Sequence, residues 1–225
     1  MIETFASRAL LADAAAEAVA EALSVANAGP LVCAGGTTPG PVYDRLARRD
    51  LAWRRLVVTL TDERFVDPTS DESNERLIRE RLLVGKGAKA RFEPLKGAGA
   101  TPEADATAAE DRLRRLLPFS IVLLGMGPDG HVASLFPGSK ALAAGLDLGA
   151  ETLVVAVDEA GLKPLVPRIS LTAHALTSAA LIVILISGQD KREVIERIAG
   201  DPAYSPPAAT ILRQTRCPVR VLWAA

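Results

Sequence analysis

Short apolar runs alternate with helix-like segments along almost the whole chain, and this alternation constrains the fold more than any other feature. The runs have the length and composition of strands that are buried on both faces, and they cover residues 30–34, 55–60, 120–124, 152–157, 181–186 and 219–223. Patterns typical of helices lie between them, at residues 6–27, 40–49, 72–84, 103–117 and 190–199. Strands and helices in alternation predict an α/β fold in which helices cover both faces of a mostly parallel sheet.

The length of the chain is that of one large domain. With 225 residues, 49% of them hydrophobic, the chain can bury a full core without the help of a metal ion or a disulfide. Gly and Pro are frequent at residues 85–100 and 200–207, which predicts surface connections at these places. We therefore expect a single domain over residues 1–225.

Charge and cysteine usage narrow the class of partner. The 26 Lys and Arg residues nearly balance the 27 Asp and Glu residues, which argues against a surface that binds nucleic acid or an anionic membrane. Cys33 and Cys217 are too few for a disulfide framework or a zinc site, so reduced, buried thiols are expected. The Ala-rich segment 10–23 carries acidic residues at short intervals and fits neither a signal peptide nor a membrane span. We expect a cytoplasmic protein, monomeric or a small homo-oligomer, that acts on a small molecule.

Polar segments follow four of the predicted strands. They comprise residues 35–40, 61–64, 125–138 and 187–191. In open parallel sheets, ligands bind beyond the carboxyl ends of the strands, where loops lead into helices. The sequence therefore predicts a ligand site at the edge of the sheet where these four segments meet.

The segment Gly35-Gly-Thr-Thr-Pro-Gly40 joins a predicted strand to a predicted helix. Its backbone N–H groups and the helix dipole could bind an anion such as a phosphoryl group. An ordinary tight turn with a Thr cap is the alternative. The segment is neither a Walker loop nor a dinucleotide fingerprint, because its glycines are wrongly spaced and no Gly-Lys-Ser/Thr ending follows.

The segment Thr61-Asp-Glu-Arg64 places two carboxylates and a guanidinium at the end of a strand. Successive residues of an extended chain point to opposite faces, so Asp62 and Arg64 share a side and Glu63 turns away. Arg64 could make a forked contact with substrate oxygens. An internal Asp-Arg pair that only fixes the loop is the alternative, and this structural account is favoured for Glu63.

His131 lies in a glycine-rich turn, where it could act as a general base. An imidazole titrates near neutral pH, and the carboxylate of Asp129 could orient the ring and stabilise its cation. Gly127 and Gly130 leave the backbone free to approach a ligand. The alternative is a histidine that caps a helix beginning near Val132, with Asp129 as a turn residue.

The remaining candidates are single residues. His174 lies in a helix-like stretch and is expected to be structural, and the two histidines lack the spacing and neighbours of a zinc site. Arg168 and Lys191, taken alone, are interpreted as solvated surface charges. If both line the same pocket as the glycine loop, they would form a phosphate clamp.

Several motifs together resemble a known family. They are the segments 34–39, 61–66, 125–138, 168–172 and 188–191, with Ser73 and Asn74 after the second of them. They occur in the family's order and span nearly the whole chain, and the Asp-Gly-His block is the most specific. The chain resembles the 6-phosphogluconolactonases of the glucosamine-6-phosphate isomerase/6-phosphogluconolactonase family.

The resemblance implies a Rossmann-like three-layer α/β/α sandwich of the isomerase/CoA-transferase-like kind. It also implies hydrolysis of 6-phospho-D-glucono-1,5-lactone to 6-phospho-D-gluconate, a step of the oxidative pentose phosphate pathway, without a metal or organic cofactor. Carried over to this chain, it makes His131 the base that activates water, with Asp129 assisting. The expected substrate contacts are Gly35, Gly36, Thr37, Asp62, Arg64, Gly130, Arg168 and Lys191.

Two other functions stay open at this point. The isomerase/deaminase of the family has an acidic residue where this chain has Phe136 and typically a Tyr in place of Arg64, so the sequence favours the lactonase. A sugar-phosphate sensor without turnover would not need the His131 and Asp129 pair. The chain also departs from the family pattern at Ser70, where a loop His is common, and at Pro128, where a polar residue is frequent.

Overall fold

The main sheet of the protein is parallel throughout. The structure, a computed structural model, describes residues 2–25, 29–158 and 165–225. Over these residues, seven strands lie in the order β1-β10-β9-β6-β2-β3-β5, and all neighbouring pairs are parallel. Their bounds are β1 (Ile2–Phe5), β2 (Pro30–Cys33), β3 (Val57–Leu60), β5 (Arg91–Phe92), β6 (Ile121–Leu124), β9 (Ile182–Ser187) and β10 (Val219–Ala224). The mostly parallel sheet expected from the sequence is confirmed.

Strands at the centre of this sheet are buried on both faces. All residues of β6 are buried, and so are all residues of β9 except the last. A strand with a neighbour on each side and helices above and below has no exposed face, so its sequence is a continuous apolar run rather than an alternation. This is why these strands could be recognised in the sequence.

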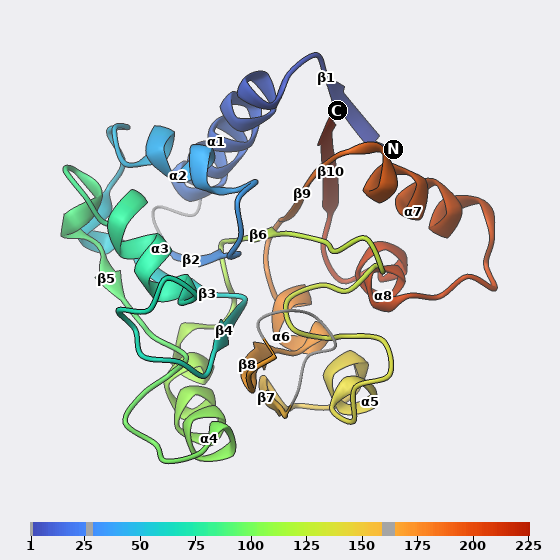
Figure 1. Ribbon diagram of the computed structural model, residues 1–225. Coiled ribbons are helices and arrows are strands. Elements are labelled where there is room, and N and C mark those ends of the chain that lie inside the picture. The colour runs from blue at the N-terminus through green and yellow to red at the C-terminus, as the bar shows by residue number, and fades with distance from the viewer. Residues whose placement is uncertain (1, 26–28, 159–164) are drawn as a thin grey trace.

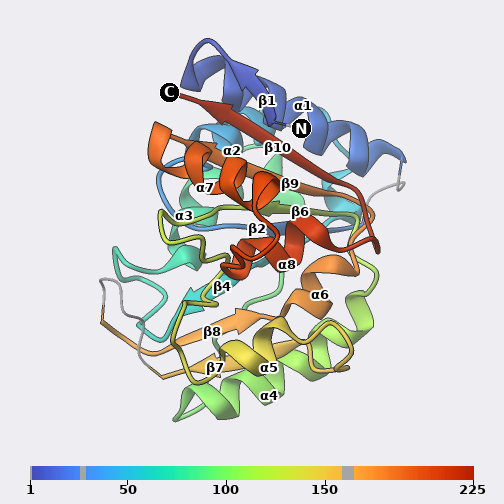
Figure 2. The same cartoon turned by 90° about the vertical axis from the view of Figure 1, so that its right-hand side faces the viewer.

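Helices cover both faces of the main sheet. Figures 1 and 2 show α1 (Arg8–Val25), α2 (Gly40–Leu46) and α3 (Asn74–Arg81) on one side, and α7 (Gln189–Gly200) and α8 (Pro207–Arg213) on the other. Small buried side chains of α1, mostly alanines, let this helix pack against β6, β9 and β10. The result is the predicted three-layer α/β/α sandwich. None of the helices in the described part of the chain is long and apolar enough to cross a membrane.

A second, smaller sheet is antiparallel. It contains β4 (Asp62–Arg64), β8 (Arg168–Leu171) and β7 (Val154–Val157), in that order. The apolar run 152–157 therefore forms a strand outside the main sheet. That run is apolar because α4 (Pro102–Leu113) packs against β7. Glu110 of α4 also accepts hydrogen bonds from the backbone N–H groups of Leu153 and Val154, at the start of β7.

The other differences from the sequence prediction concern short elements. The strands β1, β4, β5 and β8 and the helices α5 (Leu142–Leu146) and α8 were not predicted, whereas α6 (Ala173–Thr177) lies in the stretch around His174 that was expected to be helical. The predicted helices are present with ends that differ by a few residues, and 3-10 turns lie at η1 (Trp53–Arg55), η2 (Gly87–Lys89) and η3 (Arg114–Leu116). The stretch around His174, expected to be helical, is divided between β8 and α6.

Both cysteines, Cys33 and Cys217, are buried free thiols, as the sequence predicted.

Candidate active site

A pocket lies at the carboxyl ends of β2, β3, β6 and β9, where the sequence predicted a ligand site. The four polar segments that follow these strands all contribute to it, and β8 of the second sheet contributes Arg168. Its polar lining comprises Gly35, Gly36, Thr37, Thr38, Thr61, Asp62, Arg64, Asn74, Gly125, Gly127, His131, Arg168 and Lys191. The fold thus brings together most of the residues that the sequence singled out.

His131 and Asp129 form a hydrogen-bonded pair at this pocket. Nδ1 of His131 lies 2.6 Å from Oδ1 of Asp129, and the same oxygen accepts a hydrogen bond from the His131 backbone N at 3.2 Å. An ionised carboxylate favours the tautomer in which Nδ1 carries the proton, which leaves Nε2 as the basic nitrogen. The pair has the arrangement expected of a general base and the carboxylate that orients it.

A tight turn brings these two side chains together. The backbone N of Gly127 donates to the carbonyl of His131 at 3.0 Å, and Gly130 N donates to the carbonyl of Gly127 at 3.0 Å. Gly130 has a φ of 78°, which favours glycine. The described residues that follow form turns and bridges until α5, so the alternative interpretation of His131 as the cap of a helix starting near Val132 is wrong.

Gly127 must be a glycine because the His131 ring lies against it. A Cβ built at Gly127 would lie 2.1 Å from Cε1 of His131 and 2.7 Å from Oδ1 of Asp129. These separations are far below the roughly 3.5 Å at which carbon atoms normally meet. The glycine therefore permits the contact between the imidazole and the carboxylate.

Arg64 and Arg168 lie directly opposite each other on two neighbouring strands of the second sheet, β4 and β8. The register of β4 and β8 pairs Arg64 with Arg168 and Asp62 with Ser170. Like charges at directly opposite positions of an antiparallel pair repel each other and destabilise it. An anion between the two guanidinium groups would reduce this repulsion, so the pair is suited to binding an anion.

Arg168 is an unusually buried arginine, with only 4% of its surface exposed. Burial lowers the pKa of its guanidinium group below the ordinary value, with Asp62 acting in the opposite direction and Arg64 in the same direction. Its Cζ lies 5.1 Å from the centre of the Phe136 ring. The same ring lies 4.5 Å from the centre of the His131 ring, tilted by 46°. Phe136 thus contacts both the candidate base and the buried cation.

The glycine loop forms the wall of the pocket beside α2. Gly36 has a φ of 94°, and a Cβ at Gly35 would lie 1.9 Å from Oδ1 of Asn74, so neither position accommodates a side chain without strain. Oγ1 of Thr38 lies 3.3 Å from Oγ of Ser187, which places the loop next to the end of β9. Backbone N–H groups and hydroxyls are therefore presented close to the start of α7.

Lys191 lies in the first turn of α7, at the same side of the pocket. Its Nζ donates to the Ser187 carbonyl and to Asp190, both at 3.4 Å, and its side chain is partly exposed. Gly188, which precedes the helix with a φ of 94°, is fixed by a 2.8 Å hydrogen bond from Nε1 of Trp223 to its carbonyl. An ammonium group beside a helix N-terminus favours a bound anion.

Glu63 turns away from the pocket, as the alternation along the strand predicted, and it caps α3. Its carboxylate accepts hydrogen bonds from the backbone N of Arg64, Asn74 and Glu75 and from Oγ of Ser73, at 2.7 to 2.9 Å. Burial raises the pKa of this carboxyl above its ordinary value, while the hydrogen bonds act in the opposite direction. The role is structural, as expected, but the carboxylate is held by backbone N–H groups and the Ser73 hydroxyl and not by pairing with an arginine side chain.

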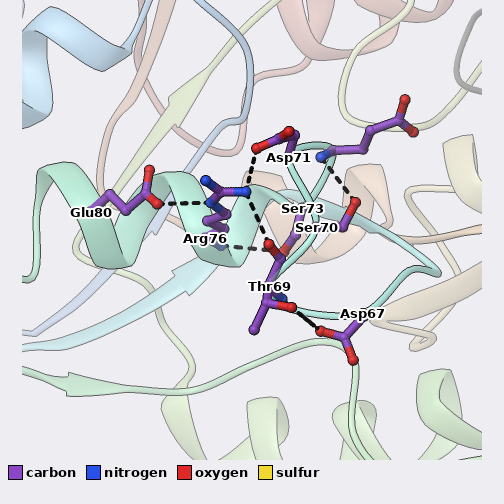
Figure 3. A network of polar contacts seen from close by, with 8 residues as sticks. Asp67, Thr69, Ser70, Asp71, Ser73, Arg76 and Glu80 are labelled. Carbon is purple, nitrogen blue, oxygen red and sulfur yellow. Dashed lines mark hydrogen bonds and ion pairs between the residues drawn. The ribbon is translucent and has the colours of Figure 1, made fainter.

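The loop after β4 is tied to α3 by a polar network (Figure 3). Nη1 of Arg76 donates to the Thr69 carbonyl at 3.0 Å and pairs with Asp71. Ser70, at the position of the family's frequent histidine, accepts a hydrogen bond from the backbone N of Glu72 at 3.2 Å. In this chain the loop is thus ordered by contacts that need no histidine.

The structure does not place every candidate at the pocket. Gly130 is absent from its lining and faces Pro206 instead, where a Cβ would lie 2.6 Å from the proline side chain, so its role is in the turn. Asp129 reaches the site only through His131. His174 lies elsewhere, with Nδ1 3.1 Å from the Leu148 carbonyl, which agrees with the structural role expected for it.

The sequence did not reveal the roles of two residues: Asn74, which lines the pocket, and Phe136, which packs against two residues that line it. Asn74 is 2% exposed and donates from Nδ2 to the Asp62 carbonyl at 2.8 Å; its match to the family pattern was the only signal. Phe136 was considered only for the acidic residue that it replaces, and its contacts with His131 and Arg168 had no signal in the sequence.

These features define the class of the protein: an α/β protein whose parallel sheet carries, at its carboxyl edge, a cationic pocket with an imidazole–carboxylate pair. The cations and the glycine loop suit a small phosphorylated ligand. Among the described residues, no group of three or more His, Cys, Asp or Glu side chains could hold a metal ion.

Comparison with known proteins identifies the family. The sequence profile of the glucosamine-6-phosphate isomerases/6-phosphogluconolactonase family matches residues 6–223. A 6-phosphogluconolactonase of Caulobacter vibrioides is 47% identical over 227 aligned positions, which cover 99% of this chain and 97% of the relative. The chain belongs to the glucosamine-6-phosphate isomerase/6-phosphogluconolactonase family, and the resemblance noted in the sequence is confirmed.

Solved structures agree with this result. The crystal structure of a 6-phosphogluconolactonase from Shewanella baltica superposes with a TM-score of 0.92 and 33% identity, covering 100% of this chain and 97% of that one. The solved structure of the 6-phosphogluconolactonase from Trypanosoma brucei has a TM-score of 0.86 and 28% identity, covering 100% of this chain and 95% of that one. A monomeric glucosamine-6-phosphate deaminase has a TM-score of 0.82 at 21% identity, covering 99% and 96%, so that likeness concerns the fold alone.

Proposed function

We propose that this protein hydrolyses 6-phospho-D-glucono-1,5-lactone to 6-phospho-D-gluconate, with His131 as the general base. The observation that carries the proposal is the presence of the His131–Asp129 pair in the same pocket as the arginine pair of β4 and β8. Binding alone would require the cations but not an imidazole oriented by a carboxylate. Relatives named 6-phosphogluconolactonase support the choice of substrate.

The reaction is acyl transfer from the ring oxygen of the lactone to water. Nε2 of His131 takes a proton as water attacks the lactone carbonyl, and the resulting oxyanion is stabilised by backbone N–H groups of the glycine-bearing loops. The bond between the carbonyl carbon and the ring oxygen then breaks. The imidazolium returns its proton to that oxygen, so the products are a carboxylic acid and a hydroxyl group, and the acid then releases a proton to the solvent and becomes the carboxylate of 6-phosphogluconate.

Binding of the phosphate keeps the sugar ring in register with His131. Arg168, Lys191 and the backbone of the glycine loop form the clamp for this group, and Arg64 contacts oxygens of the substrate. A lactone is already a reactive ester, so fixed orientation together with base and oxyanion contributions suffices for catalysis.

Phe136 argues against the isomerase/deaminase reaction as the main activity. A proton relay at this position would need a carboxylate, whereas Phe136 is 3% exposed and presents an aromatic ring to both His131 and Arg168. Arg64 adds a cation where the isomerase typically has a Tyr. The site therefore fits lactone hydrolysis better than aldose–ketose isomerisation.

The cellular setting is part of the same proposal. The reaction would take place in the cytoplasm as a step of the oxidative pentose phosphate pathway, and the protein would act as a monomer or small homo-oligomer. Two buried free thiols and a charge balance close to neutral support this setting.

The proposal predicts catalysed acid release from freshly generated 6-phosphogluconolactone, measured above the rate of spontaneous opening. Glucosamine 6-phosphate, assayed in parallel for ammonia and fructose 6-phosphate, should give no turnover. Deamination without lactone hydrolysis would replace this function by the isomerase reaction. Binding of the sugar phosphate without any turnover would establish the sensor instead.

Replacement of Gly127 by alanine should impair this activity without removing any functional group. A methyl group would push the His131 ring away from Asp129, and misplacement by about 1 Å can reduce a rate about 100-fold. We expect kcat of Gly127→Ala to fall by about 10- to 100-fold. Gly200→Ala is the control, because a Cβ at Gly200 has nothing within 4 Å; equal kcat values for the two variants would contradict the described geometry.

A further inference from the structure

The loop that carries His131 is attached to the second sheet by Ser134. Oγ of Ser134 donates to Oδ2 of Asp62 at 2.6 Å, and the backbone N of Ser134 donates to Oγ of Ser170 at 3.1 Å. Thr61 Oγ1 donates to the other oxygen of Asp62 at 2.9 Å. Ser134, Ser170 and Thr61 are fully buried. The contact is thus a hydrogen-bond network shielded from water, and a network of this kind fixes its members rigidly.

The partners of Ser134 are themselves a cross-strand pair. Asp62 lies opposite Ser170 in the register of β4 and β8, and the next pair on the same face is Arg64 opposite Arg168. Two residues along a strand correspond to about 7 Å. Ser134 therefore binds the cross-strand pair next to the pair of arginines. In the sequence it follows His131 by three residues.

The backbone next to Ser134 is held in an uncommon conformation. Ala133 has a φ of 50°, in the left-handed region that non-glycine residues seldom adopt. Such a conformation persists where the surroundings determine it. Ala133 also lines the pocket, between His131 and the buried Ser134.

We propose that Ser134, through Asp62 and Ser170, is a positioning residue that sets the place of His131 relative to the arginine pair. The inference rests on the proposed function and deepens it. His131 belongs to a loop after β6 in the main sheet, whereas Arg64 and Arg168 belong to the second sheet. The distance between the base and the phosphate clamp depends on how the loop after β6 is attached to the second sheet. The Ser134 contacts connect this loop to β4 and β8 directly beside the site.

The test is the kinetic behaviour of Ser134→Ala. We expect kcat for 6-phosphogluconolactone to fall by about 10- to 100-fold, because the base loses its place relative to the bound substrate. The dissociation constant of 6-phosphogluconate, measured by calorimetry, should change less than about threefold, since the arginines stay on their strands. Ser170→Ala, which removes the second contact, should behave in the same way. Because both contacts belong to one network, the double variant should lose less than the product of the two single losses.

Ser178→Ala is the matched control, because its hydroxyl donates to the Ala175 carbonyl at 2.6 Å, away from the pocket. Thermal unfolding of each variant gives the loss of stability. A merely structural role of Ser134 would lower the unfolding temperature but leave kcat per folded molecule at the wild-type value, and this result in both Ser134→Ala and Ser170→Ala would overturn the inference. Wild-type protein without lactonase activity would instead overturn the proposed function on which it rests.

Discussion

His131→Gln should lose about 100- to 10,000-fold in kcat for 6-phosphogluconolactone, the contribution typical of general acid–base catalysis. Glutamine has polar atoms but no basic nitrogen, so water would no longer be activated. The 6-phosphogluconate dissociation constant should change little, because the phosphate clamp that we propose consists of Arg168, Lys191 and the glycine loop and does not include the imidazole. Initial rates corrected for spontaneous opening, with calorimetric binding of the product, measure both quantities.

The second histidine of the chain provides the control for this variant. His174 is outside the pocket, where Nδ1 lies 3.1 Å from the Leu148 carbonyl. His174→Gln should retain the wild-type kcat, with at most a small change in the unfolding temperature. If His131→Gln hydrolyses the lactone as fast as His174→Gln, the imidazole is not the base.

Arg168→Gln should raise KM for the phosphorylated lactone by about 10- to 100-fold. A hydrogen bond to a charged group contributes about 1.5–3 kcal/mol, and each 1.4 kcal/mol corresponds to a factor of ten. The lactone without a phosphate group should be hydrolysed by the variant about as well as by the wild type. The ratio of kcat/KM for the two lactones therefore measures the contribution of Arg168 to phosphate recognition.

Loss of folding must be separated from loss of binding, because Arg168 is buried. Arg168→Lys keeps the charge but not the planar fork, and we expect an intermediate KM. Arg220→Gln is a control: Arg220 pairs with Glu3 between β10 and β1 and is not part of the pocket. Equal losses for the two lactones in a folded Arg168→Gln would contradict the phosphate role.

The parallel core could be predicted because its strands have no exposed face. The runs that became β2, β3, β6, β9 and β10 are apolar at nearly every position, and the polar segments after them follow the general rule for ligand sites in such sheets. That rule alone was enough to place the glycine loop, the Asp62–Arg64 segment and the Asp-Gly-His turn at one edge of the sheet.

The second sheet could not be predicted because its pairing is long-range and β4 is very short, although the run that forms β7 was recognised as a strand. β4 has three residues, too few for a period of two to be recognised, and its partner β8 lies more than a hundred residues later in the chain. The opposition of Arg64 to Arg168 is a property of that register. The same holds for Ser134, whose partners are known only once the two sheets are assembled.

The central claim is that one pocket binds the phosphate of the substrate and presents its lactone carbonyl to His131. A crystal structure of the protein with 6-phosphogluconate bound tests it most directly. We expect the phosphate on Arg168, Lys191 and the glycine loop, with the carboxylate about 3 Å from Nε2 of His131 or one water molecule away. A ligand bound in the opposite orientation, with its phosphate against His131, or outside this pocket, would contradict the account.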